Sequence, residues 1–217
     1  MKKAAAAAAG LIVAVAIGLV VVVSSQPAVT HVERSVTIDA SPGDVFPFLN
    51  DYANWGEWSP WDDKDPDMTI TMSTPSAGVG ATYEWQGNQD VGKGRMEILA
   101  SADGTSVTHD LHFMEPWESK AVVTHALVSG DDSVTMTWGM DTENGFMAKA
   151  MSLMMDMDAM IGPDFEHGLA MLKQAAEKAA AERAEAERVA AEAAAEAARA
   201  HGEGAEKGGA APGAQEG

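Results

Sequence analysis

The sequence predicts an α+β fold that combines a seven-stranded antiparallel sheet with a long C-terminal helix. Between residues 31 and 141, seven segments alternate apolar and polar residues, which is typical of strands with one buried and one solvated face. An apolar stripe at spacings of three and four follows, from residue 147 to residue 172. That spacing places one face of a helix against a core.

The first thirty residues predict export. Two lysines precede Ala4–Val23, twenty residues without a polar side chain. A helix of that length spans about 30 Å, the thickness of a bilayer's hydrocarbon core. A cleaved signal peptide is the alternative, but its apolar part is usually about 7–15 residues long, and the best cleavage site, Val23-Ser24-Ser25, is mediocre. We favour an uncleaved single-pass anchor at residues 1–30, with the domain on the extracytoplasmic side of the cell membrane.

The folded domain is expected at residues 31–175, beginning with a strand at 31–39. Ser41 and Pro42 then predict the start of a short helix, as capping residue and first helical residue. Three tryptophans follow within residues 55–61. These rings either close one end of the core or, in the case of Trp58 or Trp61, line the mouth of a cavity.

Six more strands are predicted between residues 68 and 141, separated by turns rich in glycine, proline and aspartate. Successive side chains of a strand point to opposite faces, so alternate residues share the inward face. Those inward residues are Met68, Ile70, Met72, Ala81, Tyr83, Trp85, Met96, Ile98, His109, Leu111, Phe113, Val123, His125, Leu127, Val134, Met136, Trp138 and Met140.

A long helix is expected from Asn144, with a kink near Ala159 because Pro163 lacks a backbone donor. Its inward stripe would comprise Met147, Met151, Met154, Asp158, Ile161, Phe165 and Leu172. Residues 176–200 are mostly Ala, Glu and Arg, which favour helix without offering an apolar stripe. We therefore expect a solvated helical extension at 176–200, available to a protein partner, and a disordered tail at 201–217.

Charge and cysteine content exclude several classes of protein. The net charge is −19, and residues 31–175 contain 24 acidic and seven basic residues. Such a surface repels phosphate backbones, so no nucleic-acid partner is expected. The chain has no cysteine, which excludes disulfides and thiolate metal sites. The acidic run at 62–67 lacks the glycine and terminal glutamate of a calcium loop, and no metal or cofactor is expected.

Three separated blocks carry a resemblance to a known family: NWGEWSPW (54–61), AGVGATYEWQGNQDVGKGRMEI (77–98) and MDMDAMIGPDFEHGLAMLK (155–173). The chain resembles the SRPBCC (START-like) superfamily, in its bacterial branch of polyketide cyclase/dehydrase-like proteins. The resemblance implies a helix-grip fold, in which a curved sheet wraps the C-terminal helix and leaves a pocket between them. Members include lipid and hormone binders and aromatase/cyclases.

The candidate ligand-binding residues are aromatic, methionine and ionisable side chains at the predicted inward positions. Methionine is flexible and polarisable, so such a wall adapts to varied apolar ligands, although methionine also serves simply to fill a core. The candidates are Trp58, Trp61, Tyr83, Trp85, Met96, His109, Phe113, His125, Met136, Trp138, Met151, Met154 and Asp158.

Three functions are compatible with this pattern. The first is a membrane-tethered binding or carrier domain for a hydrophobic small molecule or lipid. The second is a polyketide cyclase/dehydrase-like enzyme, in which Asp158 pairs with His109 or His125 as general acid and base; the same pair could instead be a satisfied part of the core. The third is an interaction protein that works through its C-terminal helix and has a filled core.

Overall fold

The structure, a computed structural model, describes residues 2–208, and it describes side chains at residues 10, 11 and 13–199. Residues 1 and 209–217 lie outside this description. The tail expected to be disordered, residues 201–217, therefore falls mostly outside the described residues. The last helix runs to Gly208, so the first part of that predicted tail is helical.

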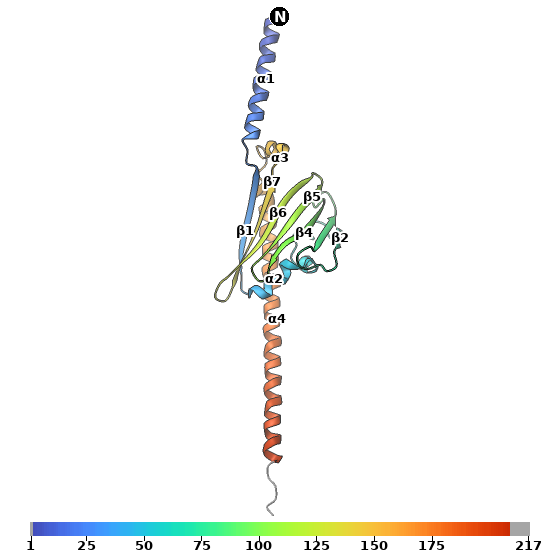
Figure 1. The fold of residues 1–217 in the computed structure, drawn as a ribbon, viewed down its shortest axis with the longest axis vertical. Helices are drawn as coiled ribbons and strands as arrows, with labels where there is room; N and C mark the ends of the chain where they lie inside the picture. The colour runs from blue at the N-terminus through green and yellow to red at the C-terminus, as the bar shows by residue number, and fades with distance from the viewer. Residues whose placement is uncertain (1, 209–217) are drawn as a thin grey trace, which may run out of the picture.

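One antiparallel sheet of seven strands forms the body of the domain (Figure 1). Its spatial order is β1-β7-β6-β5-β4-β3-β2, which confirms the predicted strand number and antiparallel pairing. The strands are β1 (Val29–Ile38), β2 (Thr69–Met72), β3 (Thr82–Gln86), β4 (Lys93–Ala102), β5 (Ser106–Glu115), β6 (Ser119–Ser129) and β7 (Val134–Glu143).

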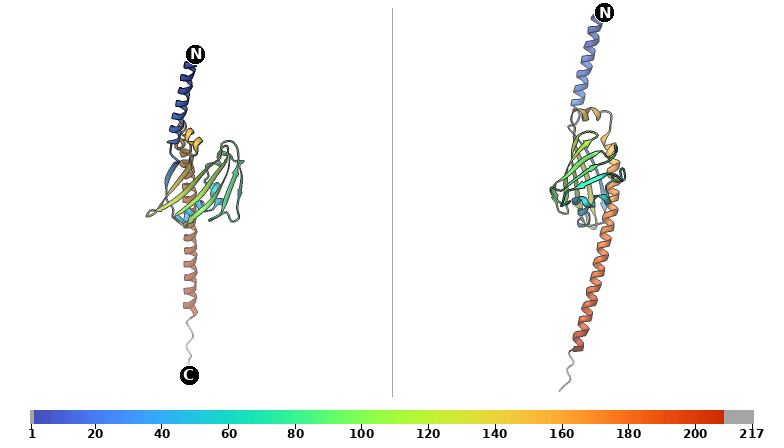
Figure 2. Two further views of the ribbon diagram at one scale, coloured as in Figure 1. Left: turned by 45° about the horizontal axis from the view of Figure 1, so that its top comes forward. Right: turned by 90° about the vertical axis from the view of Figure 1, so that its right-hand side faces the viewer.

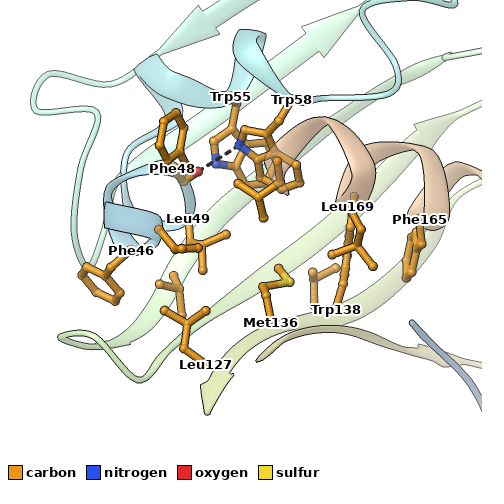
Figure 3. Packing of buried hydrophobic residues seen from close by; sticks show 14 of the residues in the cluster. Phe46, Phe48, Leu49, Trp55, Trp58, Leu127, Met136, Trp138, Phe165 and Leu169 are labelled. Atoms are coloured by element: carbon orange, nitrogen blue, oxygen red, sulfur yellow. Dashed lines mark hydrogen bonds between the residues drawn. The ribbon is translucent and has the colours of Figure 1, made fainter. Parts of the chain in front are cut away.

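Three helical elements cover one face of this curved sheet: α2 (Pro42–Asn50), the 3-10 helix η1 (Tyr52–Glu57) and α4 (Met157–Gly208), as Figure 2 shows. The core lies between them and the sheet (Figure 3). Inward residues such as Ile98, Met136 and Leu172 are fully buried. Burying an apolar side chain of this size stabilises a fold by about 1.5–3 kcal/mol, so the strand alternation is the main sequence signal of the core.

The predicted long helix from Asn144 is wrong in its first part. A short helix, α3 (Phe146–Met151), is separated from α4 by residues 152–156. Asp156 starts the new helix, because its Oδ1 accepts hydrogen bonds from the backbone N–H of Asp158 (3.0 Å) and Ala159 (3.3 Å). This capping satisfies donors that a continuous helix would have used internally. Residues before Asp156 therefore do not belong to the stripe that packs on the core.

The core extends along α4 beyond the expected domain end at residue 175. Ala176 is fully buried, and Ala179 and Ala180 pack against the core cluster. Arg183 reaches α2, donating from Nε to Oδ1 of Asp44 at 2.7 Å and from Nη2 to Oδ2 at 3.0 Å. Asp44 also accepts from the backbone N–H and hydroxyl of Ser41. The first turns of the predicted solvated extension are thus docked on the domain.

Replacing Arg183 by alanine should lower the thermal unfolding midpoint by a few degrees. Hydrogen bonds from Arg183 are the main reason that the pKa of Asp44 is lowered to about 2, and the variant leaves that buried carboxylate without its charged partner. Differential scanning calorimetry measures the shift. Arg188→Ala is the matched control, because the partners of Arg188 among the described side chains are Glu185 and Glu192 of its own helix. Equal midpoints for the two variants would contradict docking by Arg183.

Helix α1 (Lys2–Ser24) and the free part of α4 leave the domain at opposite ends (Figure 1). The predicted membrane anchor falls on α1, and the side chains at 4–9 and 12 are outside the described residues. Over the part of the chain that is described, no helix meets the length and apolarity needed to cross a membrane.

Candidate functional site: an apolar cavity between the sheet and α4

A cavity of about 300 Å³ lies between the sheet and the first turns of α4. That volume is at the lower end of the range for small-molecule sites. Most of its wall is aromatic or aliphatic. The lining residues are Trp55, Ser59, Trp61, Lys64, Met68, Tyr83, Trp85, Asp90, Val91, Met96, Leu111, Phe113, Val123, Trp138, Met140, Met160, Ile161, Asp164 and Phe165.

Two aromatic groups build opposite walls. Trp138 of β7 stacks on Phe165 of α4, with ring centroids 4.2 Å apart and planes 11° from parallel, and the edge of Trp61 meets Trp138 at 5.7 Å. On the other side, Trp85 of β3 contacts Phe113 of β5 in a T-shaped pair at 5.6 Å. Such contacts contribute beyond their buried area and hold rings in fixed orientations. The cavity is therefore a shaped apolar space.

Gly94 fixes the position of Trp85. The two residues are paired across β3 and β4, and a Cβ on Gly94 would overlap atoms Cη2 and Cζ2 of the Trp85 ring. The indole Nε1 also donates to the carbonyl of Val91 at 3.0 Å. The Trp85 ring, which forms this wall of the cavity, thus occupies the space that a side chain at residue 94 would fill.

The polar groups of the cavity are few and lie mainly at its rim, which we define as Lys64, Asp90, Met160 and Asp164, the more exposed part of the wall. Nζ of Lys64 donates to Oδ2 of Asp164 at 2.6 Å, joining the loop after η1 to α4. An ion pair at this position satisfies both charges, so neither Lys64 nor Asp164 places an unpaired charge against the apolar interior.

Six of the predicted ligand-binding residues line this cavity: Trp61, Tyr83, Trp85, Met96, Phe113 and Trp138. Trp58 and Met136 are buried in the core beside it. The indole Nε1 of Trp58 donates to the carbonyl of Phe48 at 3.0 Å (Figure 3), which supports the structural interpretation of this ring. That the six lining residues bind a ligand stays a prediction.

The two inward histidines form a buried chain with Tyr52 behind the cavity wall. The Tyr52 hydroxyl and Nδ1 of His109 share a hydrogen bond of 3.0 Å, and Nε2 of His109 and Nδ1 of His125 share one of 3.2 Å. Burial lowers the pKa of His109 to about 3, and burial together with the neighbouring His109 lowers that of His125. Both rings are therefore neutral at pH 7, and neither lines the cavity.

The predicted pairing of Asp158 with a histidine is wrong. Asp158 lies in the first turn of α4, about half exposed, where its carboxylate accepts two hydrogen bonds from Arg34 at 2.8 and 2.9 Å. Arg34 also bonds Glu166, and it passes α4 at Gly162, where a Cβ would overlap its guanidinium. Spacing places Asp158 on the same stripe as Ile161 and Phe165, but it lies in the exposed first turn of α4, where Arg34 of β1 binds its carboxylate.

Met151 and Met154 were also expected inside, and both are exposed. Met154 has 91% of its surface exposed and Met151 has 37%. Both lie before Asp156, in α3 and the turn that follows it, so they face away from the packed part of the domain. Ile70 and Met72 of the edge strand β2 are likewise exposed, at 37% and 42%, although they were expected on the inward face.

Several lining residues were not among the candidates, notably Trp55, Lys64, Met160, Ile161 and Phe165. Ile161 and Phe165 belong to the predicted inward stripe of the helix, so that stripe was a usable signal. The Lys64–Asp164 pair joins residues 100 positions apart, and local sequence contains no signal for it. Among the described residues, no three His, Asp or Glu side chains converge as a metal site would require.

The antiparallel sheet curves around the C-terminal helix (Figure 2). Together with the apolar cavity between sheet and helix, this arrangement defines a domain of the helix-grip class. The family model described as polyketide cyclase / dehydrase and lipid transport matches residues 29–177. The chain belongs to this family, and the match confirms the resemblance to the SRPBCC superfamily.

Solved structures of bacterial proteins share the fold at low identity. Protein CV1439 from Chromobacterium violaceum is 13% identical, with a TM-score of 0.50, 70% of this chain covered and 99% of that one. Protein MLL2253 from Mesorhizobium loti is also 13% identical, with a TM-score of 0.50 and coverage of 69% and 98%. No curated protein matches the sequence significantly. These similarities define the fold alone, because such folds carry many functions.

Proposed function

We propose that this protein is a binding or carrier domain for an uncharged hydrophobic small molecule or lipid segment, tethered to a membrane by residues 4–23. The observation that carries the proposal is the cavity of about 300 Å³ with its aromatic and methionine wall. Its charged side chains are confined to the rim, so the interior favours an apolar guest over a charged one.

The arrangement of the histidines favours binding over acid–base catalysis. A general acid or base must lie within hydrogen-bond reach of its substrate. His109 and His125 are both fully buried behind Trp55 and Trp58, and of the described residues that line the cavity none is a histidine. The alternative of an interaction protein predicted a filled core, which the open cavity does not support.

The membrane tether rests on the sequence of residues 4–23 and on the surroundings of α1. Over its described side chains up to Val22, helix α1 exposes apolar side chains on all sides, including Leu11, Val15 and Leu19, each at least 60% exposed. A helix that is apolar all round is normally buried in protein or lipid. In our proposal α1 holds the domain on the extracytoplasmic side of the cell membrane.

Ligand binding is tested by filling the cavity. Val123 of β6 lines the cavity, whereas its neighbour Val122 faces outward and is 41% exposed. We expect Val123→Trp to weaken binding of N-phenyl-1-naphthylamine, an uncharged apolar fluorophore, by about tenfold or more, which corresponds to about 1.4 kcal/mol. Val122→Trp should bind like the parent chain, because the same ring is added on the solvent side.

Fluorescence titration in detergent solution measures both affinities, and circular dichroism checks that both variants fold. Unchanged affinity in a folded Val123→Trp variant would refute this cavity as the binding site. Mass spectrometry of an organic extract of the purified chain then identifies the chemical class of any natural ligand.

A further inference from the structure

The most exposed apolar surface of the domain lies on α3 and the turn after it. Six large apolar side chains within ten residues are exposed, by 37% to 91%. We call this surface the apolar patch, and it consists of Phe146, Met147, Met151, Leu153, Met154 and Met155. Contiguous apolar patches on soluble domains usually mark a surface that another phase or partner covers.

The patch is an island without negative charge on a strongly acidic domain. Residues 145–155 contain no Asp or Glu and a single basic residue, Lys149. Elsewhere the excess of acidic groups repels an anionic bilayer surface. At this position a lipid interface receives apolar side chains and one cation, the combination that interfacial segments use to enter the boundary between headgroups and acyl chains.

Its location agrees with that chemistry. Helix α1 contacts α3 and leaves the domain at the same end (Figure 1). Val15, Leu19 and Val21 on α1 are also exposed, so the patch continues the apolar surface of the predicted anchor. A protein partner or a second copy covering the patch would lie directly beside α1, a helix that is apolar all round. A lipid bilayer covers both surfaces at once.

The patch also leads to the cavity. Met160 lies five residues after the patch, is 52% exposed and belongs to the cavity rim. Met157, between them, packs against the core cluster. Met157 and Met160 thus provide apolar side chains between the patch and the cavity rim.

We propose that the apolar patch inserts into the interfacial layer of the lipid bilayer and holds the cavity rim at the membrane surface, so that a hydrophobic guest is exchanged with lipid. This rests on the proposed function for the identity of the guest, whereas the insertion is independent of it. Interfacial segments of this kind reach about 5–10 Å into the bilayer. The rest of the acidic domain stays in water.

The absence of cysteine from the chain permits a clean test with one label. The full chain carrying Met154→Cys is labelled with the environment-sensitive fluorophore NBD and reconstituted into phosphatidylcholine vesicles. The control is Val128→Cys, which is 65% exposed and lies near the β6–β7 turn. That turn is at the end of the sheet opposite to α3, because Val134 pairs with Ile38 and Glu143 with Val29.

We expect the label at Met154→Cys to shift to shorter wavelength in vesicles and to be quenched by lipids brominated on their acyl chains. The label at Val128→Cys should keep its aqueous emission and be quenched only by iodide in solution. If the chain floats with the vesicles in a density gradient but brominated lipids quench both labels equally, the insertion is overturned and the tether stays intact. Failure of the full chain to float would overturn the tether and the insertion together.

Two further results would also overturn the proposal. A short-wavelength label at Met154→Cys in detergent with concentration-dependent dimers would assign the patch to a second copy, and a partner protein required for the shift would assign it to that protein. Binding of N-phenyl-1-naphthylamine in detergent is unaffected by any of these outcomes, so loss of insertion and loss of the ligand site are distinguished.

Discussion

Replacing Gly94 by alanine should destabilise the domain by about 1–3 kcal/mol, the usual cost of overpacking a core, and should weaken ligand binding at the same time. A Cβ at this position overlaps the Trp85 ring and lies 2.8 Å from the carbonyl oxygen of His112. The backbone of β4 is held on both sides by β3 and β5, so the ring has to move. Trp85 then leaves its edge contact with Phe113, and the cavity wall changes shape.

Gly145→Ala is the matched control for this substitution. Gly145 precedes α3 with a φ of −66°, and a Cβ added there would meet no heavy atom within 4 Å, so alanine should be nearly neutral. Urea unfolding measures stability, and titration with N-phenyl-1-naphthylamine measures binding. A Gly94→Ala variant as stable as Gly145→Ala, with unchanged affinity, would contradict the role assigned to the Trp85–Gly94 contact.

The inward faces of the strands were predictable because side-chain direction in a strand depends on local alternation. His109 and Leu111 are buried on β5 as the sequence predicted, and so are Val134, Met136 and Trp138 on β7. The separation of cavity from core was not predictable in this way. Trp58 and Trp61 are three residues apart, yet one fills the core and the other lines the cavity, although both rings contact Trp138. The difference arises from tertiary packing, which local alternation does not encode.

The helix was harder to predict than the strands. Methionine at 147, 151 and 154 matches a helical stripe, but spacing alone does not show where a helix starts. The carboxylate of Asp156 caps α4 two residues before Asp158, and this local hydrogen bond separates the outward methionines from the packed helix. Capping by Asp is itself a sequence signal. The methionine spacing continues across Asp156, so periodicity and capping predict different helix starts, and the capping residue is the correct signal.

Acidification from pH 6.5 toward pH 4.5 should destabilise the protein before its carboxylates titrate. In the unfolded chain a histidine binds a proton with a pKa near 6.5, whereas in the folded chain burial keeps the pKa of His109 at about 3 and that of His125 well below its usual value. The unfolded state therefore binds more protons throughout this window, and stability falls as pH falls. Each histidine contributes a slope of about 1.4 kcal/mol per pH unit.

Urea unfolding at a series of pH values measures this slope. In His125→Leu the slope should fall by about half, because one buried proton acceptor is removed while Tyr52 keeps its hydrogen bond to His109. His167→Gln is the control, since His167 is about half exposed and pairs with Asp63 at the surface. His31 acts in the opposite direction, because its hydrogen bond to Asp141 raises its pKa, and it is present in all three proteins. An unchanged slope in His125→Leu would contradict the conclusion that burial keeps His125 neutral in the folded protein.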